Sequence, residues 1–583
     1  MYALTAGSLA AQDQRPTAPA DAARPVLRVA HIAGAIRIDG KLDEAAWATA
    51  DSISDLVQIE PAQGATPSGQ TVVRVLARGD AIIIGIRAYD PAPGLITSFS
   101  RQRDANLDNE DHVRIVLDTY LDGRSGYVFT VNPNGARYDA LITNQGESQN
   151  ADWDAVWEAA TERTNTGWSA EILIPAKSLL FKRGLTDWGF NIQRRVQRLQ
   201  ETSRWASPRR DVKINQTSRA GILSDVPPFD LGLGLSVRPS VTASSEIPSL
   251  SASVATDADV SLDVTQRLGA NTQASLTWRT DFAETEVDTR RTNLTRFPLS
   301  FPEKRTFFLE GSDVFDFGLG TGTDVRPFFS RRIGLLGGRE IPVDAGLKVN
   351  GREGATQFGA LVVRTGAVDS VTEASTMGVV RVRRDVFRES SVGLIAAAGD
   401  PRARAGSWLA GPDLTYQTTR FLGGKNFLAG AWGLATDREG LTGKRHALGG
   451  MLDYPNDLLD IALTYKWIGD GFDPSLSFVP RRGVQMLTFN VTHRPRPTRP
   501  ILGMRVRQIT NESMNTLVTD LDGKWESYRI FTAPINWRLE SGDRFEFNFV
   551  PTGERLVDPF EIAPGVTIPV GSYGWNRWRL EGG

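Results

Sequence analysis

Residues 231–247 read LGLGLSVRPSVTASSEI, a stretch in which apolar and polar side chains alternate. Leu233, Leu235 and Val237 lie on one face of it, and Arg238 lies on the other. Side chains on a β-strand repeat every two residues, so the stretch predicts a long strand with one apolar and one polar face.

The same alternation recurs in about fifteen segments as far as Leu580, among them DADVSLDVTQ (257–266) and TQASLTWRTDF (272–282). A tilted strand that crosses a bilayer needs roughly 9 to 11 residues, whereas strands of globular proteins have mostly about 5 or 6. These segments are mostly of the longer kind, which favours an antiparallel β-barrel of the outer-membrane type. A soluble β-sandwich or propeller gives the same alternation and remains the alternative.

The composition argues against several classes of protein. The chain has 583 residues, a formal net charge of -2 and no cysteine, and its mean hydropathy is -0.25. No run of about 20 apolar residues is present, so a helical membrane protein is not predicted. The near-neutral charge gives no basic footprint for nucleic acid, and the lack of cysteine excludes disulfides and thiolate metal sites.

The first 28 residues indicate an export signal followed by a linker. MYALTAGSLAAQDQ has a short apolar stretch with small residues near its end, and RPTAPADAARP is rich in Pro and Ala. This pattern predicts export through the periplasm from a residual signal peptide, with a disordered tail as the alternative.

Residues 29–226 predict a second, smaller domain. Its strands are short and bounded by Gly, Pro and Asp, which favours an antiparallel β-sandwich with one short helix in LDEAAWATA. The expected strands are IRIDG, QTVVRVLARG, AIIIGIRAYDP, DHVRIVLDTY, GYVFTVNPNG, WSAEILIP and WGFNIQRRVQR. The turn-rich DVPPFDLG ends the domain, and residues 227–583 form the barrel domain.

Four of these strings carry a resemblance. IRIDGKLDEAAWATA, AIIIGIRAYDP, NEDHVRIVLDT and GWSAEILIPAKSL resemble, in this order, the framework of family 9 carbohydrate-binding modules. TRFPLSFPEKRTFFLEGSDVFDFG, PFFSRRIG, NPNGARYDALIT and DWDAVWEA are similar to a bacterial family in which such a module precedes an outer-membrane barrel of unassigned function. The resemblance implies an all-β chain. Family members continue further and outer-membrane chains tend to end on an aromatic residue, so we expect the barrel to be incomplete at LEGG.

A sugar site combines exposed aromatic rings with polar donors and acceptors. The candidates for carbohydrate binding are Trp153, Trp157, Trp205, Arg103, Tyr138 and Asn144. The alternative for each tryptophan is a place in the hydrophobic core.

Metal and catalytic signals are weak. The acidic run DANLDNEDH (104–112) offers oxygen ligands, and the resemblance allows calcium, but the spacing differs from an EF-hand loop and favours a solvated turn. The sequence has no HExxH motif, and no metal ligand or other cofactor is expected. A glycosidase needs two carboxylates about 5 to 9.5 Å apart. Asp152, Asp154, Glu158 and Glu171 are available, but no spacing marks a pair.

Residues 284–341 lack alternation and are rich in Phe. Connections this long are usually functional or packed against something. The segment could fold into the barrel as a plug, or could dock the sandwich against the barrel mouth; the sequence leaves both open.

The sequence therefore predicts a carbohydrate-binding protein of the bacterial outer membrane, with no catalytic residues. Its partners are a polysaccharide or oligosaccharide and outer-membrane lipid, and its barrel acts as anchor or pore for glycan capture or uptake in polysaccharide catabolism. The alternative is a secreted or membrane-associated, xylanase-like glycoside hydrolase that uses the sandwich as its binding module.

Overall fold

The computed structural model describes residues 24–143, 146–151, 153–246, 255–280, 293–337 and 339–583. These residues form an almost entirely β structure, as the alternation predicts, with two short α-helices, α1 (Ala45–Thr49) and α3 (Thr306–Leu309). Short 3-10 helices are η1 (Pro93–Leu95), η3 (Ala176–Ser178), η4 (Gln197–Leu199), η5 (Thr217–Arg219), η6 (Ser312–Phe315) and η7 (Ser330–Arg332). In the described residues, no helix has the length and apolar character needed to span a bilayer.

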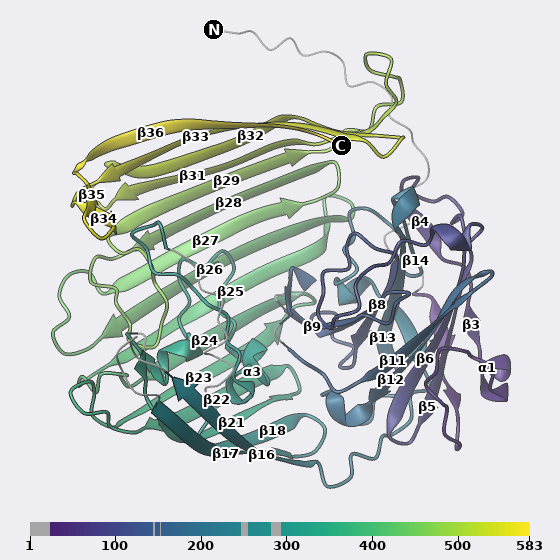
Figure 1. Cartoon of the computed structure of the whole chain (residues 1–583), viewed down its shortest axis with the longest axis horizontal. Helices are drawn as coiled ribbons and strands as arrows, with labels where there is room; N and C mark the ends of the chain where they lie inside the picture. The colour runs from purple at the N-terminus through teal and green to yellow at the C-terminus, as the bar shows by residue number, and fades with distance from the viewer. Residues whose placement is uncertain (1–23, 144–145, 152, 247–254, 281–292, 338) are drawn as a thin grey trace.

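The N-terminal part, hereafter the module, is a sandwich of two sheets (Figure 1). The nine-stranded sheet contains β1 (Val26–Arg28), β4 (Val57–Glu60), β7 (His112–Asp118), β8 (Gly126–Val131), β9 (Arg137–Thr143), β10 (Ser148–Asn150), β13 (Trp188–Val196), β14 (Glu201–Arg204) and β15 (Gly221–Ser224). The six-stranded sheet contains β2 (Ala30–His31), β3 (Ser52–Ile53), β5 (Thr71–Arg78), β6 (Ala81–Tyr89), β11 (Glu158–Thr164) and β12 (Gly167–Pro175).

One hydrophobic core fills the space between these sheets. Val75 and Ile84 from the smaller sheet meet Ile115 and Phe129 from the larger one, and all four side chains are fully buried. Burying such a side chain contributes about 1.5 to 3 kcal/mol, and this core is what makes the module a folding unit.

Six of the seven strands expected in the module are confirmed, and one is wrong. Residues 36–40 are irregular because the backbone N–H groups of Asp39 and Gly40 donate to the Glu171 carboxylate, at 2.9 Å each, instead of to a neighbouring strand. The helix expected in LDEAAWATA is present as α1, and its Trp47 is buried.

The rest of the chain forms one 17-stranded sheet in which order follows the chain (Figure 1). Its strands are β16 (Leu235–Glu246), β17 (Ala255–Arg267), β18 (Thr272–Trp278), β21 (Val343–Glu353), β22 (Thr356–Thr365), β23 (Ser375–Val386), β24 (Ser390–Ala398), β25 (Trp408–Phe421), β26 (Lys425–Asp437), β27 (His446–Pro455), β28 (Leu459–Ile468), β29 (Val484–His493), β30 (Val506–Ile509), β31 (Asn511–Asp520), β32 (Trp525–Leu539), β33 (Arg544–Leu556) and β36 (Gly571–Gly582). Two small hairpins, β19 (Leu335–Leu336) with β20 (Arg339–Glu340) and β34 (Phe560–Ala563) with β35 (Val566–Ile568), lie in its connections.

The two faces of this large sheet differ in character. On β23, Val380 and Val382 are exposed on the outer face, while Met377, Val379 and Arg381 are buried on the inner face. The same alternation of exposed apolar residues continues across the sheet, for example at Val237, Val260, Leu276, Leu347, Val362, Leu394, Leu414, Leu448, Leu463, Leu487, Leu517 and Ile530. The outer face is therefore apolar although it is exposed.

The Phe-rich segment, residues 293–341 in the described part of the chain, packs on the inner face of the sheet. Phe307, Phe308 and Phe315 form one buried cluster with strand residues such as Val363 and Met377. Their rings lie in contact with strand backbone, since a Cβ placed at Gly346 would come within 3.0 Å of the Phe307 ring. The segment thus fills the inside of the curved sheet.

Charged strand residues of the inner face bind this segment as well. Arg381 is fully buried, pairs with Asp413 at 2.9 Å, and donates to the Asp316 carbonyl at 3.1 Å. Lys466 pairs with Asp324 at 2.5 Å. Buried charges need such partners, so these pairs specify where the segment sits.

Candidate functional site

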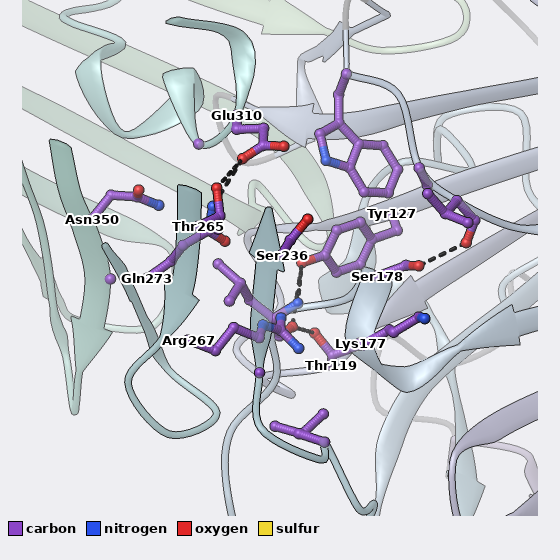
Figure 2. Close-up of a pocket in the computed structure, with 18 of the residues that line it drawn as sticks. Thr119, Tyr127, Lys177, Ser178, Ser236, Thr265, Arg267, Gln273, Glu310 and Asn350 are labelled. Atoms are coloured by element: carbon purple, nitrogen blue, oxygen red, sulfur yellow. Dashed lines mark hydrogen bonds between the residues drawn. The ribbon is translucent and has the colours of Figure 1, made fainter. Parts of the chain in front are cut away.

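A cavity of about 840 Å³ lies where the module, the inner face of the large sheet and the Phe-rich segment meet. Figure 2 shows Tyr127, Ser178 and Lys177 of the module on one side, and Gln273 and Asn350 of the sheet on the other. Its volume falls within the range of about 300 to 1,000 Å³ that is usual for ligand pockets.

The module contributes an aromatic wall. Trp153 is half-buried and lines the cavity, and its ring lies 5.0 Å from the Tyr127 ring and 6.1 Å from the Phe129 ring. Tyr127 also lines the cavity, and its hydroxyl accepts from the Leu180 N–H at 2.8 Å. Burial raises the pKa of Tyr127 to about 12, so this phenol stays neutral.

The loop that carries Trp153 is held by Asp139, a fully buried residue of β9. Its carboxylate accepts from the Ala155 N–H at 2.7 Å, from the Trp157 indole at 3.0 Å and from Arg103 at 2.7 Å. Burial raises the pKa of Asp139, and these hydrogen bonds oppose that rise. Three charge-assisted bonds to one buried carboxylate give the loop a defined position.

Two of the predicted stacking residues lie in the core. Trp157 is 2% exposed and packs edge-on against Phe129 at 5.1 Å. Trp205 is 7% exposed and packs against Phe190 at 5.9 Å. A sugar needs an exposed ring face, so Trp153 alone of the three is placed to offer one.

The predicted polar residues have structural partners. Arg103 pairs with Asp139 and Asp154 and donates to the Ala155 carbonyl at 2.8 Å. Tyr138 belongs to strand β9, and its hydroxyl donates to Gln149 at 3.0 Å. Asn144 lies outside the described residues.

Glu310 joins the Phe-rich segment to three strands at the cavity wall. Its carboxylate accepts from Arg238 of β16 at 3.0 Å, from Thr265 of β17 at 3.3 Å and from Gln273 of β18 at 3.1 Å. Figure 2 shows Glu310, Thr265 and Gln273 on the same side of the cavity. An ionised carboxylate only accepts hydrogen bonds, and through these three bonds Glu310 links the Phe-rich segment to β16, β17 and β18.

Asn350 on β21 is a buried polar residue at the cavity wall. The side chain is 4% exposed and lines the cavity. Its Oδ1 has no hydrogen-bond partner among the residues that the structure describes. Gly311, with φ +66°, lets the Phe-rich segment pass close to this amide, because a Cβ there would lie 2.3 Å from Nδ2. An unsatisfied buried acceptor costs about 1 to 3 kcal/mol, which a donor on a ligand or water would offset.

The three described carboxylates among those considered for catalysis lie in different surroundings. Glu171 is fully buried and holds the Asp39 and Gly40 N–H groups and the Trp47 indole. Asp154 pairs with Arg103, Glu158 is exposed on β11, and Asp152 lies outside the described residues.

Two carboxylates of the acidic run at residues 104–112 accept hydrogen bonds from other parts of the module. Glu110 is fully buried, and its carboxylate accepts from the Phe99 N–H and from Asn132. Asp111 accepts from the Gln197 N–H at 2.9 Å. Within the described ranges, no group of three or more His, Cys, Asp or Glu residues could hold a metal ion.

Sequence reasoning missed Asp139, Glu310 and Asn350. A signal for Asp139 was present, since it is an acidic residue within the strand-like ARYDALIT. Glu310 and Asn350 come from segments far apart in the chain, and only the folded sheet brings them to one cavity.

A family model described as "Domain of unknown function (DUF5916)" matches residues 235–347, which include β16 and the Phe-rich segment. No curated protein matches the chain.

Several solved structures are similar to the chain. A family 9 carbohydrate-binding module from Caldicellulosiruptor kristjanssonii in complex with cellotriose has 18% identity and a TM-score of 0.26, with 35% of this chain and 96% of that chain covered. A module of that family and organism in complex with glucose has 18% identity and a TM-score of 0.25, with 34% and 94% covered. OccAB2 from Acinetobacter baumannii has 6% identity and a TM-score of 0.28, with 81% and 96% covered. These sequence identities and TM-scores are too low to support a functional argument, which has to rest on the residues of this chain.

Proposed function

We propose that this chain is a saccharide-binding protein of the bacterial outer membrane. Its large sheet is the wall of a β-barrel that anchors it in lipid, and the cavity beside Trp153 holds the saccharide. The observation that carries the binding proposal is this cavity, which combines an aromatic ring with an unsatisfied buried amide on the opposite wall.

The membrane part of the proposal is supported by the character of the two sheet faces. A soluble sheet places its polar face in water, whereas here the exposed outer face carries Val362, Val380 and Leu394. The inner face carries Lys348 and Arg381, both fully buried. Apolar side chains outside and polar ones inside are the arrangement of a transmembrane barrel, because lipid surrounds its outer face.

The saccharide part is supported by the chemistry of the cavity. A sugar presents C–H-rich faces and hydroxyl edges, which suit a ring with polar groups around it. Trp153 supplies a half-buried ring, while Ser178, Gln273 and Asn350 supply neutral polar groups. The proposed mechanism is capture of the saccharide without bond cleavage.

Binding is tested with the purified full chain in detergent, by titration calorimetry against a panel of plant and bacterial oligosaccharides. Trp153→Ala should weaken binding by about 1 kcal/mol or more, because a stacking ring dominates such sites. Phe99→Ala is the matched control, since Phe99 is an exposed aromatic residue of the module that does not line the cavity.

Asn350→Ala separates a binding role from a structural one. The change removes a buried acceptor that lacks a partner, so it should weaken saccharide binding while leaving the melting temperature unchanged or higher. Lack of binding across the whole panel, or equal affinity in wild type, Trp153→Ala and Asn350→Ala, would refute the saccharide site.

A further inference from the structure

The two ends of the large sheet differ in the connections between their strands. At one end, hereafter the short-turn end, strands are joined by residues 268–271, 354–355, 387–389, 422–424, 456–458 and 540–543, and by the longer connection 494–505. At the opposite end the connections include residues 279–342, 366–374, 399–407, 438–445, 469–483 and 557–570. Most turns at the first end are tight, and most connections at the second are long loops.

The module sits against the short-turn end (Figure 1). Arg124 of the module donates to the carbonyl of Phe387, in the turn after β23, at 3.1 Å. Arg219 donates to the Thr419 carbonyl near the end of β25 at 2.8 Å. Further along the same end, Asn426 at the start of β26 donates to the Asp211 carbonyl at 2.6 Å. Contacts beside two successive turns, 387–389 and 422–424, hold the module at this end.

A four-residue ion-pair network strengthens this junction. Arg124 pairs with Asp385 at 2.5 Å, and Arg352 pairs with both Asp385 and Asp122. The module supplies Arg124 and Asp122, the sheet supplies the other two, and all four side chains are at most 15% exposed. Each part thus offers one cation and one anion to its partner, and separating them would leave charges without partners.

From this geometry we infer that the module and the saccharide cavity lie on the periplasmic side of the outer membrane. The inference rests on the proposed function. In outer-membrane barrels the short turns face the periplasm and the longer loops face the outside of the cell. Because the module is bound to the short turns, it shares their side, and the saccharide it captures is met at the periplasmic end of the barrel.

The chain has no cysteine, so single thiols can be placed at will. Lys41→Cys marks an exposed site on the module, and Lys444→Cys and Asp369→Cys mark exposed sites in two long loops. Cells that express each full-length variant are treated with a membrane-impermeant maleimide, first intact and then after the outer membrane is permeabilised.

Lys41→Cys should be labelled only after permeabilisation, whereas the loop variants should be labelled in intact cells. Labelling of Lys41→Cys in intact cells would overturn the inference. Fractionation of the same cells separates the two proposals. A chain recovered in outer membranes with Lys41→Cys labelled from outside refutes the sidedness alone, while a chain absent from outer membranes refutes the membrane anchor and the sidedness together.

Discussion

Buried polar residues position the candidate site at the scale of single side chains. Asp139 gathers Arg103, the Trp157 indole and the Ala155 N–H, and so holds the loop on which Trp153 stands. Trp157 packs against Phe129, which Trp153 also contacts. A residue can therefore matter for a binding site without touching the ligand.

Asp139→Ala should destabilise the module, because the buried Ala155 N–H and Trp157 indole N–H would each lose their acceptor, at about 1 to 3 kcal/mol each. The measurement is the thermal melting of the purified full chain. Asp154→Asn is the control, since Asp154 pairs with the same arginine but is largely exposed. Equal melting temperatures for the two variants would contradict the central role given to Asp139.

The lowered pKa of His112 predicts that the module loses stability as the pH falls. Burial lowers the pKa of His112 from 6.5 to about 4. The folded state thus holds this proton less tightly than the unfolded chain does. The stabilisation by neutral His112 is therefore full above pH 6.5 and is lost as the pH falls toward 4. Between these two values, the free energy of unfolding should fall by about 1.4 kcal/mol for each pH unit.

The chain has 4 histidines, so their ring signals can be followed by NMR in a histidine-labelled sample. The signal that disappears in His112→Gln should keep its neutral position until the pH approaches 4. Titration of that signal near pH 6.5 would show that the side chain is solvated and would remove the predicted acid sensitivity.

The sequence could not tell which tryptophans are exposed and which lie in the core. Trp153 and Trp157 lie four residues apart in similar surroundings, yet one lines a cavity and the other is in the core. Their difference depends on which neighbour each ring meets after folding, and the neighbours Phe129 and Tyr127 come from β8. Residue type predicts the chemistry that a side chain can perform, but not its exposure.

At the scale of elements, long strands were predictable because alternation is a local property. The alternating stretches that begin at residues 231, 257 and 272 correspond to β16, β17 and β18. The segment 36–40 has a strand-like pattern but binds a buried carboxylate instead. Here a long-range contact to Glu171 overrides the local preference.

The Phe-rich segment could not be placed from the sequence, since both a plug and a docking extension fit its composition. The structure shows features of each. Phe307 and Phe315 pack on the inner face of the sheet, while Ser312 accepts from Asn150 of the module at 3.3 Å. The segment therefore packs against the inner face of the sheet and also contacts the module.

Phe307→Ala should destabilise the folded sheet by about 3 to 5 kcal/mol, because it leaves a cavity in a packed cluster. The Phe307 ring lies 5.1 Å from the Phe308 ring and is otherwise in contact with Gly346. The measurement is urea unfolding of the chain in lipid vesicles. Phe387→Ala, at an exposed phenylalanine, should change stability little, and an equal loss in both variants would argue against the packed segment.

At the scale of the whole molecule, the decisive fact is which face of the large sheet is apolar. Alternation in the sequence shows that one face is apolar but does not say whether this face lies inside or outside. The structure places Val380 outside and its neighbours Val379 and Arg381 inside. Soluble monomers rarely expose contiguous apolar patches larger than a few hundred Å², so the exposed apolar band across these strands motivates the proposed contact with lipid.

The central claim is that this outer face lies in lipid, and quenching by brominated lipid tests it most directly. A fluorescent label is attached to Val380→Cys on the outer face, and in a second variant to Lys41→Cys on the module, and each full chain is reconstituted in vesicles. We predict strong quenching of the label at residue 380 and none at residue 41, because bromine atoms in acyl chains quench only labels within the bilayer. A label at residue 380 that stays unquenched in brominated lipid would contradict the proposed membrane anchor.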